Sequence, residues 1–122
     1  MAEPKFIHLR VHTAYSLSEG AMPVPKLIHR LHDQGVPAIA ITDTANLFGG
    51  KAFSKYASDE GIKPILGSQF YLRNPDSQDM LKSKGRIIEP DKIVILVMDA
   101  EGYANIMHLM KVAYLDLSLI HI

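Results

Sequence analysis

The sequence predicts an α/β fold, because segments with the periodicity of strands alternate with segments with the periodicity of helices. Residues 37–42 (PAIAIT) form a short apolar run typical of a buried strand, whereas residues 26–34 carry apolar side chains at helical spacing. Along the chain the expected order is strand, helix, strand, helix, strand, loop, strand and helix. This alternation favours a mainly parallel sheet with right-handed crossovers between its strands.

The first strand and the first helix are expected at residues 6–12 and 26–34. In the segment FIHLRVH apolar and polar side chains alternate, so Arg10 and His12 share a polar face that must meet solvent or a functional interior. The helix begins after two prolines, which a first turn tolerates, and Gly35 is placed to end it.

The second strand and the second helix repeat this arrangement. Residues 37–42 lead directly into Asp43, and residues 52–60 predict a helix that Gly61 stops. Residues 63–72 then predict a third strand, in which Gly67 marks either a bulge or a place where another backbone comes close.

The remaining segment differs in character. Residues 73–90 are polar, contain two prolines, and predict a surface excursion with at most a short turn of helix. Residues 92–98 are rich in Ile and Val and predict a fourth strand, and residues 101–115 predict a long helix. The apolar face of this helix consists of Ile106, Leu109, Met110 and Ala113.

Two closures of the sheet fit this order, an open doubly wound sheet and a barrel. An open sheet that binds nucleotides would carry G-x-G-x-x-G after its first strand, which residues 12–20 lack, and the triplet at 49–51 lacks the spacing of a P-loop. A (β/α) barrel needs about eight units and ~250 residues. Four strands would therefore supply about half of a barrel.

Composition excludes several classes of protein. The chain has 122 residues, and its 13 Lys and Arg balance 13 Asp and Glu, so it carries no electrostatic signature of nucleic-acid binding. It has no cysteine, which excludes disulfides, thiolate zinc sites and cysteine nucleophiles. No apolar run approaches the ~20 residues that span a bilayer, and no secretory signal is visible. The expectation is a cytoplasmic protein with no membrane partner.

Polar side chains gather where the expected strands end, which is the face that carries sites in parallel α/β folds. They are Arg10, His12, Asp43, Thr44 and Gln69. Together with Glu19, the imidazole and carboxylates could bind Zn²⁺ or Mn²⁺, but Arg10 cannot ligate a cation and would repel one. We therefore favour a histidine of the polar core or rim for His12 over a metal ligand. No Ser-His-Asp arrangement is expected, because Ser16 and Ser18 have no base at a spacing that fixes the geometry.

Four ordered strings carry a family resemblance. FIHLRVHTAYSLSEG, PAIAITDTANLFGGKAFSKYA, GIKPILGSQFYL and EGYANIMHLM resemble the start of the bacterial DNA polymerase III alpha subunit family, its PHP (polymerase and histidinol phosphatase) domain. The resemblance implies a distorted (β/α)7 barrel. Residues 1–116 would be the N-terminal part of an incomplete PHP domain, about half of the barrel. The final LSLIHI, residues 117–122, is expected to be a tail encoded by a sequencing adapter.

The resemblance also implies which positions hold metal in metal-binding members of the family. The His-x-His pair of the first strand corresponds to Arg10 and His12, the following acid to Glu19, and Thr-Asp-His to residues 42–44. The carboxylate of the third strand is replaced by Gln69, and a histidine that opens the fourth strand by Lys92. The full set is Arg10, His12, Glu19, Asp43, Thr44, Gln69 and Lys92. We expect this site to be degenerate and free of metal, with no catalytic or cofactor-binding residue in the segment.

The function that the resemblance implies is that of a fragment. The parent chain would be a DNA-directed DNA polymerase, a nucleotidyltransferase that uses Mg²⁺ and meets DNA through other parts of the chain. This PHP segment would be inactive as a phosphoesterase and would serve as a structural module that docks the proofreading exonuclease subunit and other replicase subunits. The alternatives are a stand-alone metal-dependent PHP phosphoesterase or phosphatase, and an unrelated α/β binding module.

Overall fold

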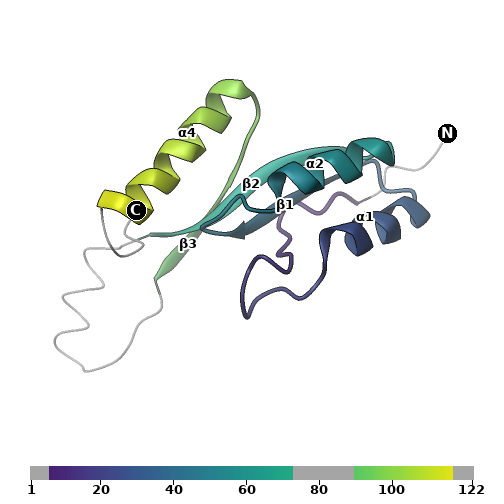
Figure 1. The fold of residues 1–122 in the computed structure, drawn as a ribbon, viewed down its shortest axis with the longest axis horizontal. Coiled ribbons are helices and arrows are strands. Elements are labelled where there is room, and N and C mark those ends of the chain that lie inside the picture. Colours follow the sequence, from purple (N-terminus) through teal and green to yellow (C-terminus); the bar gives the residue numbers. More distant parts are fainter. Residues whose placement is uncertain (1–5, 73–89, 117–122) are drawn as a thin grey trace.

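A three-stranded sheet forms the fold, with one helix before its first strand, one between its first two strands and one after its last strand. The computed structural model of the chain describes residues 6–72 and 90–116, and the statements below concern these residues. Their elements are α1 (Val24–Asp33), β1 (Ala38–Thr44), α2 (Gly50–Asp59), β2 (Lys63–Leu72), β3 (Asp91–Leu96), α4 (Ala100–Lys111) and the π-helical turn η1 (Val112–Asp116) (Figure 1). The strands and helices expected in these places are confirmed, with the exception of the first strand.

The sheet has the order β1-β2-β3 and mixes two strand directions. β1 and β2 are parallel, with Thr44 opposite Gln69, whereas β2 and β3 are antiparallel, with Tyr71 opposite Lys92. The expectation of a mainly parallel sheet is thus wrong for β3. Parallel neighbours need a crossover, usually a helix, but antiparallel neighbours do not. The excursion predicted for residues 73–90 lies outside the described residues except at Pro90.

The strand expected at residues 6–12 is not a regular strand, although the segment lies along the edge of β1. The Ala40 amide donates to His8 O (3.0 Å) and the Thr42 amide to Val11 O (2.8 Å). The acceptors are three residues apart and the donors two, so one extra residue breaks the ladder. The Val11 amide donates to the Thr42 hydroxyl oxygen (3.0 Å) instead of a carbonyl. The alternation of side chains predicted a strand here, and that prediction is wrong because alternation could not reveal this offset.

The first two helices end alike and cover the same region of the sheet. Each ends at a glycine in the left-handed region, Gly35 (φ 66°) and Gly61 (φ 70°), and the next amide reaches back into the helix, as in a Schellman motif. α1 packs against α2, and α2 packs on β2 (Figure 1). The buried apolar cluster between them consists of Val24, Leu27, Ile28, Leu31, Ile39, Ile41, Phe53, Ala57 and Ile62.

The last helix lies apart from α1 and α2, near the other end of the sheet (Figure 1). The Asp99 side chain caps it by accepting from the Gly102 amide (2.7 Å). Ile106 and Ala113 of its predicted apolar face are buried, and the other two residues of that face are half-buried. Among the described residues, no helix has the length and apolar character needed to cross a membrane.

Gly67 allows β2 and β3 to approach each other. A methyl group at this position would lie 2.5 Å from Ile95 O and 2.9 Å from Leu96 Cδ2. The structure therefore confirms the close approach predicted at Gly67.

We predict that Gly67→Ala lowers the free energy of unfolding by about 1–3 kcal/mol, because the methyl group would meet backbone that cannot move without separating two strands. The matched control is Gly102→Ala, where the nearest atom outside the helix backbone, Asp99 Oδ1, is 3.4 Å away. Thermal unfolding of both variants measures the difference. Equal melting temperatures for the two variants would contradict the prediction.

Candidate functional site

Six of the seven positions singled out by the family resemblance come together at the carboxyl ends of β1 and β2 and in the loop before α1. They form one continuous set of polar contacts, which also includes two residues that the sequence did not single out. We call this set the polar network. Its members are Arg10, His12, Thr13, Ser16, Glu19, Asp43, Thr44 and Gln69.

One half of the polar network joins four of the positions that the resemblance aligns with metal ligands. The Arg10 guanidinium donates to Gln69 Oε1 (2.5 Å), and the Gln69 amide group donates to the Thr44 hydroxyl (3.3 Å). The Thr44 hydroxyl in turn donates to Glu19 Oε1 (2.9 Å). Thr44 and Gln69 can meet because they are register partners on neighbouring strands and so share a face of the sheet.

The other half centres on His12 and Ser16. Glu19 Oε2 lies 3.6 Å from His12 Nε2, and His12 Nδ1 lies 3.0 Å from the Ser16 hydroxyl oxygen. Ser16 directs its single hydroxyl hydrogen to Asp43 Oδ1 (2.7 Å), so His12 Nδ1 must be the donor in its contact with Ser16. The Thr44 amide also donates to Ser16 Oγ (3.0 Å). Ser16 therefore links the imidazole, the carboxylate and the end of β1.

The Asp43 side chain joins β1 to the loop that follows residues 6–12. Its Oδ1 accepts from the Thr13 amide (2.7 Å) as well as from Ser16, and its Oδ2 accepts from the Thr13 hydroxyl (2.8 Å). The residue is 2% exposed. Three protein donors thus compensate a buried carboxylate that would otherwise be costly to remove from water.

The sequence predicted no Ser-His-Asp arrangement, because no base follows Ser16 at a spacing that fixes the geometry. The structure brings Ser16 into hydrogen bonds with both His12 and Asp43. The order differs from that of a hydrolytic triad, because the serine proton is held by the carboxylate and not by the imidazole. Ser16 is also only 2% exposed. This geometry fits a structural role for the serine.

Sequence reasoning missed Thr13 and Ser16 as members of the polar network. A signal was present, because the spacing Thr-x-x-Ser directly after the extended segment suits a turn. The Ser16 amide indeed donates to Thr13 O (3.0 Å). Only the tertiary structure shows that both hydroxyls of this turn point to Asp43.

Of the seven positions that the resemblance aligns with metal ligands, Lys92 alone lies outside the polar network. Its ammonium group lies 5.7 Å from the centre of the Tyr71 ring, its register partner across β2 and β3, which is a cation–π contact. Its side chain therefore contacts an aromatic ring and none of the carboxylates of the network.

Two observations test whether the site suits a metal ion. Within residues 6–72 and 90–116, no group of three or more His, Asp or Glu side chains is placed to hold one. In the same part of the chain, every buried side-chain nitrogen or oxygen has a hydrogen-bond partner. The described residues thus leave no buried polar atom waiting for a ligand.

Comparison with known proteins gives a consistent family. Residues 8–119 match the family model described as the PHP domain. The chain is 37% identical over 115 residues to the DNA polymerase III subunit alpha of Vibrio cholerae and 38% identical over 111 residues to that of Pseudomonas fluorescens. These matches cover 94% and 91% of this chain but only 9% of each relative, so the chain spans about one-tenth of their length.

Similar solved structures share the fold at low sequence identity. A protein described as a metal-dependent phosphoesterase from Bifidobacterium adolescentis has a TM-score of 0.54 and 18% identity, over 77% of this chain and 28% of that one. An amidohydrolase from Chromobacterium violaceum, solved with bound sulfate and no metal, has a TM-score of 0.55 and 18% identity, over 90% and 34%. At such identity these neighbours show the fold alone, and they agree with part of a PHP-type barrel.

We predict that Asp43→Asn lowers the free energy of unfolding by about 1–3 kcal/mol, because an amide nitrogen would face a donor where a carboxylate oxygen now accepts. The control is Asp59→Asn at the exposed end of α2. Thermal unfolding reports the loss, and a shift no larger than that of the control would show that Asp43 does not fasten the loop.

Proposed function

Because this chain belongs to the PHP domain family, we propose that it is the N-terminal part of the PHP domain of a DNA polymerase III alpha subunit. The similarity of more than nine-tenths of the chain to alpha subunits supports this assignment. The parent chain would be the DNA-directed polymerase, using Mg²⁺ and contacting DNA through its other parts, in the cytoplasm. This segment would contribute architecture to it.

We propose in addition that the PHP site of this segment works without metal. The observation that carries the proposal is the contact between Arg10 and Gln69. A guanidinium keeps its proton at any physiological pH and has no lone pair to offer a cation. Here it donates to an amide that replaces the carboxylate of metal-binding relatives, so two former ligand positions bind each other.

The remaining acids of the polar network already have protein partners. Glu19 accepts from Thr44 and faces His12, and Asp43 accepts from Thr13 and Ser16. A metal ion would have to displace these donors and remain near the Arg10 charge. Catalytic zinc sites use three protein ligands, and phosphatases often use two metals. The donor set of the described residues does not fit such a centre.

The alternative is a metal-dependent phosphoesterase, a function with which the fold of the structural neighbours is compatible. It requires ligands in the first half of the site that Arg10, Thr44 and Gln69 do not provide. The two functions therefore differ in a property that can be measured directly, the metal content of the protein.

We predict that the complete parent polymerase contains far less than one metal ion per molecule by elemental analysis, when it is purified from cells grown with added Zn²⁺ and Mn²⁺. The triple variant Arg10→His, Thr44→His, Gln69→Glu restores the ligand types of metal-binding relatives and should bind more metal than the natural protein. The matched control is Arg10→Lys, Thr44→Ser, Gln69→Asn, which disturbs the same contacts without supplying ligands. Stoichiometric metal in the natural protein, with phosphoester hydrolysis that a chelator abolishes, would establish the alternative.

We also propose that the domain is a docking platform for the proofreading exonuclease subunit and other subunits of the replicase. A domain without its own chemistry can be retained for such a role, because folds and activities separate readily.

The complete parent polymerase, immobilised on a support, should capture the purified exonuclease subunit from solution. A variant of the parent polymerase that lacks the entire PHP domain should capture much less. Primer extension by this variant verifies that the rest of it is folded. Equal capture by both would place the docking site elsewhere.

A further inference from the structure

Ala45, at the end of β1, has a backbone conformation that its side chain disfavours. Its φ of 51° lies in the left-handed region, where a Cβ crowds the following carbonyl. The residue is 2% exposed, so packing surrounds it. A non-glycine residue keeps such a conformation only when its surroundings hold it there.

Two elements form hydrogen bonds with the backbone of Ala45, one with its amide and the other with its carbonyl. Its amide donates to Gln69 O on β2 (2.8 Å), and its carbonyl accepts from the Tyr114 hydroxyl (2.5 Å), 69 residues later in the chain. Tyr114 belongs to η1, the π-helical turn that follows α4. Such turns are rare and often lie at functional sites.

The neighbours of Ala45 connect it to the polar network. Thr44, immediately before it, is the member that links Gln69 with Glu19. Asn46, immediately after it, donates to Thr44 O and to Tyr15 O, both at 3.1 Å. Ala45 therefore lies between a member of the polar network and a residue that bonds to the loop around Tyr15.

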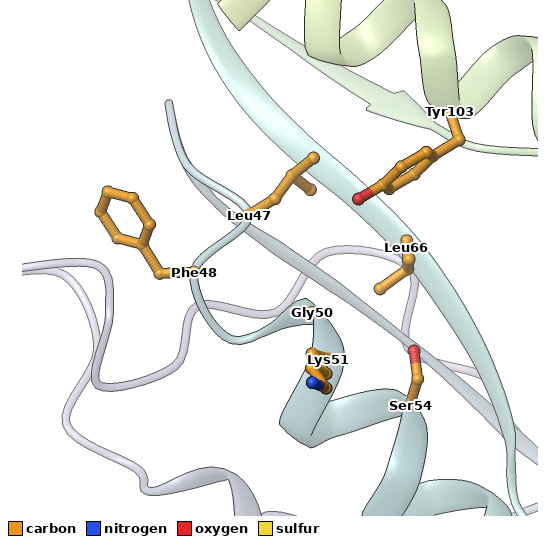
Figure 2. A pocket seen from close by; sticks show the side chains of 7 residues that line it. All are labelled: Leu47, Phe48, Gly50, Lys51, Ser54, Leu66 and Tyr103. Carbon is orange, nitrogen blue, oxygen red and sulfur yellow. The ribbon is translucent and has the colours of Figure 1, made fainter.

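The loop after β1 and the last helix also face each other beside the bond from Tyr114. Between them lies a pocket of about 230 Å³. Figure 2 shows Tyr103 of α4 pointing across it toward Leu47 and Leu66. Phe48, which follows in the loop, is 73% exposed. Beside this pocket, the hydrogen bond from the Tyr114 hydroxyl to Ala45 O joins η1 directly to the end of β1.

We propose that Tyr114 is a latch, a positioning residue that holds Ala45 in its left-handed conformation and so couples the end of the last helix to the polar network. When the hydroxyl is released, Ala45 relaxes, Thr44 moves away from Glu19 and Gln69, and Asn46 loses its position over the loop at Tyr15. The hydrophobic core beneath α1 is not part of this coupling. The latch thus allows the site region to loosen without unfolding of the domain.

Hydrogen–deuterium exchange of the full chain, measured by mass spectrometry, tests this inference with Tyr114→Phe, which removes only the hydroxyl. Exchange of peptides covering residues 43–49 should accelerate roughly two- to tenfold, the effect of losing one hydrogen bond. Peptides covering residues 13–20 should follow, because Asn46 joins the two loops. Peptides of α1 should exchange at the rate of the natural protein.

Two further variants separate a latch from general destabilisation. Tyr56→Phe, on the exposed surface of α2, is the matched control and should leave exchange at residues 43–49 unchanged. Ala45→Gly, added to Tyr114→Phe, should restore protection toward the natural level, because glycine adopts the left-handed conformation without cost. The proposal is overturned if Tyr114→Phe behaves like the control, if it accelerates exchange equally in α1, or if Ala45→Gly gives no rescue.

Discussion

The hydroxyl group of Ser16 satisfies several polar groups at once, and the arrangement of the site depends on it. It donates to Asp43 and accepts from the Thr44 amide and from His12. One small side chain thereby joins a buried carboxylate, an imidazole and the end of a strand. Because buried polar groups are costly when unpaired and favourable when fully paired, these bonds must form together. The loop before α1 is held on β1 for this reason.

Under the proposed metal-free function, protein donors in the polar network supply what a metal ion would supply in a metal-binding relative. A metal centre compensates several carboxylates and fixes neutral imidazoles in place. Here Arg10 brings a positive charge of its own, Thr44 and Gln69 carry neutral dipoles, and Asp43 is surrounded by hydroxyl and amide donors. Under the proposed function the domain is kept for its architecture, because a fold and an activity can separate.

Local patterns predicted helices and most strands well because apolar periodicity and terminal glycines act locally. They failed where distant residues decide. The direction of β3 depends on pairing with β2, and the irregular pairing of residues 6–12 depends on the Thr42 hydroxyl. The order of the expected strands predicted that Arg10 and Gln69 lie close together. The sequence did not predict the contacts of Ser16, because nothing in its spacing relates it to Asp43.

The most direct test of a metal-free site is anomalous scattering from crystals of the full chain grown with excess Mn²⁺. The account predicts no anomalous peak within coordination distance of His12, Glu19 or Asp43, and continuous density between the Arg10 guanidinium and the Gln69 amide. A peak at that place, with the Arg10 side chain turned away from Gln69, would contradict it.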